Sequence, residues 1–111
     1  MTNTTIARSI YNPSKIIGSK LDDLLEGTDM SELIKGRQGG DQIKGNGGND
    51  TLIGAGGDDR VVGGEGADIL KGNFWADIFV IDFRPEALLD GHDIILDFKL
   101  GEDKVFFSFR Q

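Results

Sequence analysis

The chain has 111 residues and a formal net charge of −7, with 17 glycines and no cysteine. This length allows one domain, and the absence of cysteine excludes disulfides and thiolate metal sites. The negative charge disfavours nucleic acid and anionic membranes as partners, because both require a basic surface, and it fits the binding of cations. No apolar run is long enough to span a membrane.

Residues 1–17 are polar and rich in Thr, Asn and Ser. They lack the apolar stretch and the small-residue cleavage site of an ordinary signal peptide. Residues 15–17 occupy the place that the strand of a preceding repeat would take. We therefore expect residues 1–17 to form a loose tail that ends in a capping strand.

Residues 18–80 repeat with a period of nine. Each of seven consecutive units begins with glycine, carries an acid at position six and has a large apolar residue at position eight. A fixed period of this kind indicates one small structural unit that stacks on copies of itself. The acids are Asp23, Glu32, Asp41, Asp50, Asp59, Asp68 and Asp77, and the apolar residues are Leu25, Ile34, Ile43, Leu52, Val61, Leu70 and Phe79.

The unit predicts an all-β fold. Its first six residues favour a glycine-rich turn, with positive φ at the glycines of position four, and its last three alternate as a short strand. Two units then complete one coil of a right-handed parallel β-solenoid, a β-roll, in which unit n stacks on unit n+2 about 4.8 Å away. Glycine at this density disfavours a helix, and a disordered linker has no reason to keep its apolar residues in phase.

Residues 81–111 break the period and are more apolar. Residues 84–90 are compatible with one helical turn. Residues 94–98 and 104–109 have the composition of strands, and a turn at 100–103 joins them. We expect this segment to form a C-terminal β cap. Its aromatic residues are expected to close the open end of the solenoid together with Phe74, Trp75 and Phe79.

The repeated acid indicates a site for a hard divalent cation. Calcium takes six to eight oxygen ligands, and glycine turns aim backbone carbonyls into one concavity beside the carboxylate. Stacked units n and n+2 then bring two half-sites around one ion. Oxygen donors without imidazole or thiolate favour calcium over zinc or copper. Local turn capping by the acids is the alternative, but that role would accept Asn and Ser equally well.

Three units, GNGGNDTLI at 45–53, GAGGDDRVV at 54–62 and GGEGADILK at 63–71, closely resemble the calcium-binding nonapeptide of the repeats-in-toxin (RTX, hemolysin-type) family. Residues 72–80 and 92–105 resemble the end of such modules. The resemblance implies a parallel β-roll with several calcium ions between stacked turns, in a secreted bacterial protein. It also implies type I secretion machinery as a partner, a signal in the C-terminal region, and folding in external calcium.

Carried over by position, the resemblance implies ligands from turn carbonyls and from the carboxylate at position six, shared by units n and n+2. The best pairing joins the units that begin at Gly45 and Gly63, followed by those at Gly36 and Gly54. The predicted metal-site residues are Gly36, Gln38, Gly39, Asp41, Gly45, Asn46, Gly47, Gly48, Asp50, Gly54, Ala55, Gly56, Gly57, Asp59, Gly63, Gly64, Glu65, Gly66, Asp68 and Asp77.

Other units depart from the pattern. Trp75 replaces the glycine at position four in the unit that begins at 72, which weakens its pairing with the unit at 54. Leu21 and Met30 make the same replacement in the first two units, and the second has Glu32 as its acid. We expect these two units to bind weakly or only to stack. Beyond the array, Asp93 and Asp97 are candidates for a terminal metal site. Asp103 is expected to lie in a turn.

Two further functions are open at this point. A β-roll of this kind also fits an accessory module of an extracellular enzyme that binds an acidic polysaccharide. That role requires an exposed aromatic or basic stripe, and the outward positions seven and nine offer Lys35, Gln42, Lys44, Arg60 and Lys71. Catalysis is disfavoured, because His92 is the only histidine and no H-E-x-x-H motif occurs. We therefore predict a calcium-binding β-roll that is not an enzyme.

Overall fold

The computed structural model describes residues 15–83, 93–99 and 101–109, and in this part of the chain it contains strands and turns but no helix. The helical turn expected at 84–90 lies outside the described residues. The strands are β1 (Lys15–Ile17), β2 (Leu24–Glu26), β3 (Leu33–Lys35), β4 (Gln42–Lys44), β5 (Thr51–Ile53), β6 (Arg60–Val62), β7 (Ile69–Lys71), β8 (Ile78–Phe83), β9 (Ile94–Ile95) and β10 (Lys104–Phe109). Over the described residues, no helix has the length and hydropathy needed to cross a bilayer.

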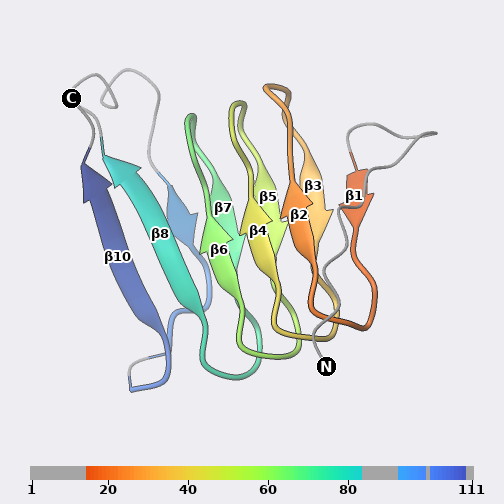
Figure 1. Cartoon of the computed structure of the whole chain (residues 1–111). Coiled ribbons are helices and arrows are strands. Elements are labelled where there is room, and N and C mark those ends of the chain that lie inside the picture. The colour runs from red at the N-terminus through yellow and green to blue at the C-terminus, as the bar shows by residue number, and fades with distance from the viewer. Residues whose placement is uncertain (1–14, 84–92, 100, 110–111) are drawn as a thin grey trace.

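The strands form two parallel five-stranded sheets that lie one behind the other (Figure 1). The strand order is β1-β3-β5-β7-β9 in one sheet, here called the odd sheet, and β10-β8-β6-β4-β2 in the other, the even sheet. Each strand pairs in register with the strand two units later, as Ile34 pairs with Leu52. The prediction of an all-β parallel solenoid with two nonapeptide units per coil is therefore confirmed.

The core is a file of side chains between the two sheets. It consists of Ile16 and the position-eight residues of all seven units, each no more than 2% exposed. In a three-residue strand only the middle side chain points inward, and the residues at positions seven and nine point outward. This alternation explains why each unit supplies one core residue. The core residues are Ile16, Leu25, Ile34, Ile43, Leu52, Val61, Leu70 and Phe79.

The C-terminal strands continue the two sheets. β9 pairs with β7, β10 pairs with β8, and all these pairings are parallel. Phe98 packs near Phe79, with 6.3 Å between ring centroids. Phe74 and Trp75 remain 70% and 64% exposed, so the expectation that they close the end of the roll was wrong. They lie in the turn of their unit, at positions three and four, outside the space between the sheets.

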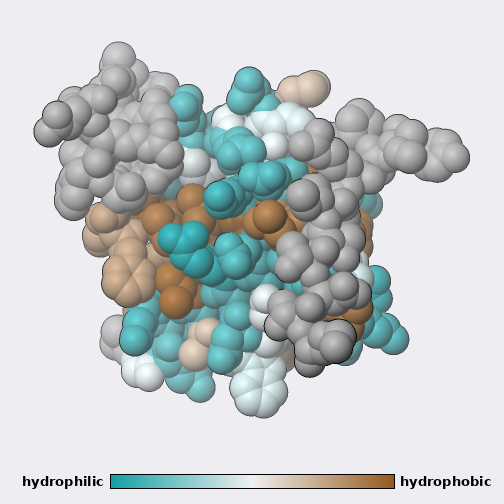
Figure 2. Space-filling view, in the orientation of Figure 1, coloured by the Kyte–Doolittle hydropathy of each residue, from teal (hydrophilic) through white to brown (hydrophobic). Residues whose placement is uncertain are grey.

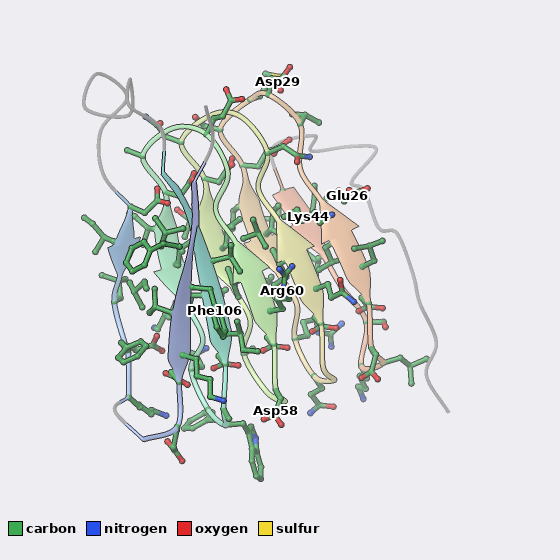
Figure 3. All side chains as sticks on the ribbon, turned by 60° about the vertical axis from the view of Figure 1, so that its left-hand side comes forward. Glu26, Asp29, Lys44, Asp58, Arg60 and Phe106 are labelled. Carbon is green, nitrogen blue, oxygen red and sulfur yellow. The ribbon has the colours of Figure 1, made fainter. Side chains whose placement is uncertain are left out.

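The outward residues considered for polysaccharide binding are divided between the two faces of the roll. Lys35 and Lys71 belong to strands of the odd sheet, whereas Gln42, Lys44 and Arg60 belong to strands of the even sheet. Figure 3 shows Lys44 and Arg60 on neighbouring strands of the even sheet. Figure 2 shows apolar and hydrophilic side chains mixed at the level of the strands. These residues therefore do not form one continuous basic stripe.

Candidate metal centre

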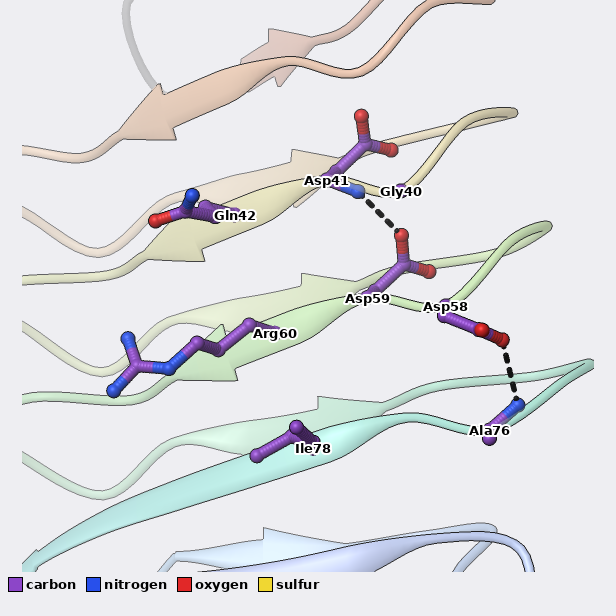
Figure 4. A pocket seen from close by; sticks show the side chains of 8 residues that line it. All are labelled: Gly40, Asp41, Gln42, Asp58, Asp59, Arg60, Ala76 and Ile78. Carbon is purple, nitrogen blue, oxygen red and sulfur yellow. Dashed lines mark hydrogen bonds between the residues drawn. The ribbon is translucent and has the colours of Figure 1, made fainter. Parts of the chain in front are cut away.

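The acids at position six form ladders through the backbone. From the third unit on, one carboxylate oxygen of each acid accepts the N–H of the acid two units earlier: Asp59 Oδ1 accepts from Asp41 at 2.8 Å (Figure 4) and Asp68 Oδ1 from Asp50 at 2.8 Å. All seven acids of the array are buried, with exposed fractions of 0–5%. Position six has the same parity as the core position, so the strand directs its side chain inward. The acids therefore stack in two columns, one beside each sheet.

The ladders continue past the array. Asp68 N–H donates to Asp93 Oδ1, and Asp77 N–H donates to Asp103 Oδ1, both at 2.9 Å. Asp103 lies at the end of a turn as expected, since its N–H donates to the Lys99 carbonyl at 2.9 Å, and its side chain, only 6% exposed, also extends the ladder. The sequence held a signal for this position. Asp103 precedes the apolar Val105 by two residues, which is the spacing between the acid and the core residue in every unit.

The second oxygen of five central carboxylates has no hydrogen-bond partner although it is buried. A buried ionised oxygen without a partner carries a large desolvation penalty, which a proton or a bound cation removes. These unpartnered atoms are the Oδ2 oxygens of Asp41, Asp50, Asp59, Asp68 and Asp77. Their spacing follows the period of the sequence, so one local cause must recur in five turns.

The glycine at position one lies so close to this unpartnered oxygen that there is no room for a side chain. A Cβ atom added to Gly45 would lie 2.6 Å from Asp50 Oδ2 and 2.6 Å from the carbonyl oxygen of Gly63 in the next coil. Real Cβ atoms do not approach oxygen so closely, so any other residue would displace one of the two groups. A carboxylate oxygen and a carbonyl oxygen of two stacked turns thus both lie close to Gly45.

The five central turns also share an unusual backbone. Their glycines at position four have positive φ as predicted, and Trp75 at the same position follows them with φ of 78°. Trp75 therefore does not change the turn, and the expected weakening of its unit is not visible in the backbone. The carbonyl oxygen of Gly48 faces Gly66 of the next coil. Position two has positive φ as well, which the sequence analysis missed, at Arg37, Asn46, Ala55, Gly64 and Asn73.

Burial raises the pKa of Asp41, Asp50 and Asp77 from 3.8 to about 7, and that of Asp59 and Asp68 to about 8. Desolvation is the largest cause in each case, and the backbone N–H of the preceding acid opposes it by stabilising the charged form. Neighbouring carboxylates raise the pKa further. Without a metal, the carboxylates of the folded columns therefore bind protons at a higher pH than carboxylates in the unfolded chain do.

This shift predicts that the metal-free roll is more stable in mild acid than in alkali. A folded-state pKa above the unfolded value of 3.8 means that the folded chain binds more protons between about pH 4 and pH 8. Stability therefore falls as the pH rises through this window, and the loss is complete above about pH 8. Far-UV circular dichroism of the calcium-free protein should show more β signal at about pH 5 than at about pH 9. Equal signals would contradict this linkage.

The donor set of the columns consists of oxygen. Among the described residues, no three His, Cys, Asp or Glu side chains gather into a metal cluster. A site here would instead draw on the carboxylates of two stacked turns and on backbone carbonyls, which suits calcium. The side chains of Gln38 and Glu65, predicted at position three, are exposed, and Glu65 N–H donates to the Asn46 carbonyl at 2.9 Å. At Glu65, the backbone at position three thus helps two turns to stack.

A second, outer ladder runs along position five. Asp58 Oδ1 accepts the N–H of Ala76 at 3.1 Å, and Asp22 Oδ1 accepts the N–H of Gly40 at 2.6 Å. Asp58 also borders a pocket of about 350 Å³ on the even side of the roll (Figure 4). The paired acids Asp22-Asp23 and Asp58-Asp59 therefore have different roles. The first of each pair, half-buried at Asp22 and exposed at Asp58, holds a turn amide, and the second lies in the buried column.

Comparison with protein families matches residues 26–61 and 35–70 to the RTX calcium-binding nonapeptide repeat (4 copies). The matched stretch contains four of the five unpartnered carboxylates, Asp41, Asp50, Asp59 and Asp68. Residues 26–70 are thus RTX calcium-binding nonapeptide repeats, and they form a calcium-binding β-roll. Neither the curated proteins nor the solved structures contain a match to the chain.

Proposed function

We propose that the chain is a non-catalytic module that folds when several calcium ions bind between its stacked turns. The observation that carries this proposal is the set of five buried carboxylate oxygens without partners. Calcium supplies a compact positive charge that accepts six to eight oxygens at about 2.3–2.6 Å. The chain supplies carboxylates, carbonyls and turns that leave no room for a side chain at position one.

Three pairs of turns meet every requirement. Both partners of each pair have positive φ at positions two and four, and the carboxylate of the earlier partner has an unpartnered oxygen. These pairs are the units that begin at Gly45 and Gly63, at Gly36 and Gly54, and at Gly54 and Gly72. Asp50, Asp41 and Asp59 would provide the unpartnered oxygen in the respective sites, and the next acid in each column would provide the second carboxylate.

Isothermal titration calorimetry with calcium and with magnesium tests this function. We expect several calcium ions to bind per chain and magnesium to bind at least about tenfold more weakly, because magnesium requires a smaller octahedral shell and retains its water. A chain that gives no heat with calcium, or that binds both ions equally well, would contradict the proposal.

We further infer that the module works outside the cell after type I secretion. RTX repeats are typical of secreted bacterial proteins, and the matched segment carries buried unpartnered carboxylates for which external calcium would be a partner. A chain whose buried carboxylate oxygens have no partner is expected to remain unfolded where calcium is scarce. An unfolded chain suits export through a narrow channel. Absence of the protein from the culture medium of its native host would speak against this localisation.

A further inference from the structure

The first two turns satisfy their acids in a different way from the central turns. Ser19 N–H donates to Asp23 Oδ2 at 2.6 Å, and the Ser19 hydroxyl donates to Asp23 Oδ1 at 2.9 Å. Thr28 repeats the arrangement: its N–H donates to Glu32 Oε1 at 2.8 Å, and its hydroxyl donates to Oε2. The carboxylates that open the two columns are therefore saturated by groups of their own turns.

The same hydroxyls also fix the shape of these turns. Ser19 Oγ accepts the N–H of Leu21 at 3.1 Å, and Thr28 Oγ1 accepts the N–H of Met30 at 3.1 Å. Of the described residues with positive φ, none lies in these two turns. This explains why Leu21 and Met30 are tolerated at position four, where the central turns require a left-handed residue. The central turns lack a hydroxyl at position two, and their carboxylates lack this partner.

The other end of the even-side column closes similarly. Lys99 N–H donates to Asp103 Oδ2 at 2.9 Å, which is the contact that Ser19 makes with Asp23. The Lys99 ammonium donates to the carbonyl of Asn73 at 2.8 Å, so a tethered cation lies against the last central turn. Both ends of this column are thus completed by protein groups, and the unpartnered oxygens lie between them.

We propose that the end turns are ion-independent caps, in which the amide and hydroxyl donors of Ser19 and Thr28 replace the calcium ions that the central turns recruit. This inference rests on the proposed calcium function. An ion at Asp23 or Glu32 would have to displace donors that are already in place and reverse the backbone of the turn. At Asp50 or Asp59 an ion meets an oxygen that has no partner. Calcium is therefore confined to the interior of the roll, and the N-terminal end, where β1 and β2 are the edge strands, is held without it.

The number of bound ions in matched variants tests this assignment. Equilibrium dialysis at saturating calcium should give one ion fewer for Asp50→Asn than for the wild type, and the wild-type number for Asp23→Asn. Both substitutions keep one acceptor oxygen and remove the charge, and circular dichroism verifies that each variant is folded. Loss of an ion in Asp23→Asn would overturn the inference and leave the calcium function intact. A wild type that binds no calcium would overturn both.

A gain of one site provides the converse test. The double variant Ser19→Asn with Leu21→Gly gives the first turn the residues of the turn at 45–50 at positions two and four. We expect it to bind one more ion than the wild type, because the hydroxyl clamp is gone and both positions accept positive φ. Leu21→Gly alone retains the clamp and should keep the wild-type number. A double variant that shows the wild-type number, or no β signal in calcium, would overturn the inference.

Discussion

Removal of calcium is expected to convert most of the β-roll to coil. Each site filled at a thousand times its dissociation constant stabilises the fold by about 4 kcal/mol. Several such sites together equal or exceed the net stability of an ordinary domain, which is about 5–15 kcal/mol. Without the ions, five buried carboxylates have an unpartnered oxygen, and each must either bind a proton or carry an uncompensated charge. The file of eight core side chains is too thin to offset this penalty.

Far-UV circular dichroism measures the transition directly. The spectrum in chelator should be that of a coil, and millimolar calcium should restore the β signal over a narrow concentration range. Magnesium at the same concentration is the matched control and should leave the coil spectrum in place. An unchanged spectrum on addition of calcium would show that the roll forms without the ion and would refute ion-dependent folding.

Gly45→Ala is expected to abolish the site between the units that begin at Gly45 and Gly63. The new Cβ would lie 2.6 Å from Asp50 Oδ2 and 2.6 Å from the Gly63 carbonyl oxygen, and the latter belongs to a backbone that two sheets hold in place. Overpacking of this kind costs about 1–3 kcal/mol, to which the loss of one ion adds about 4 kcal/mol. The calcium midpoint of folding should rise several-fold.

Gly56→Ala is the matched control. A Cβ at Gly56 would meet only atoms of Gln38, at 3.9 Å, and its backbone is not left-handed. The same substitution in the next unit should therefore leave the calcium midpoint nearly unchanged, or lower it slightly because alanine restricts the unfolded chain. Equal midpoints for Gly45→Ala and Gly56→Ala would show that the close packing of Gly45 against Asp50 does not matter for calcium binding.

The period of the sequence was sufficient to predict the strands, the inward position of residues such as Leu52, and the pairing of unit n with unit n+2. These features depend only on alternation and on a constant repeat length. The backbone at position two was not predictable in this way. Arg37 and Ala55 adopt positive φ there although neither residue favours it, because stacking on the next coil determines the turn as a whole.

The distinction between binding turns and capping turns depends on atoms that a pattern of residue types does not resolve. Asp23 and Asp50 occupy the same position, but a hydroxyl at position two reaches only the carboxylate of Asp23. Asp103 was missed because the unit around it begins with Phe98 instead of glycine. Its spacing from Val105 was the remaining signal. The parallel pairing of β10 with β8 places Val105 at a core position, and Asp103 therefore falls in line with the acids of the column.

The ladder of acids has a direction. Every acid of the central columns offers its oxygen backward, to the amide of the acid two units nearer the N-terminus, as Asp68 does for Asp50 and Asp59 for Asp41. Coils that formed from the C-terminal end would therefore present each acceptor before the matching donor is in place. In that order, each coil would offer acceptors to the coil that stacks on it, and the turns of Ser19 and Thr28 would form last.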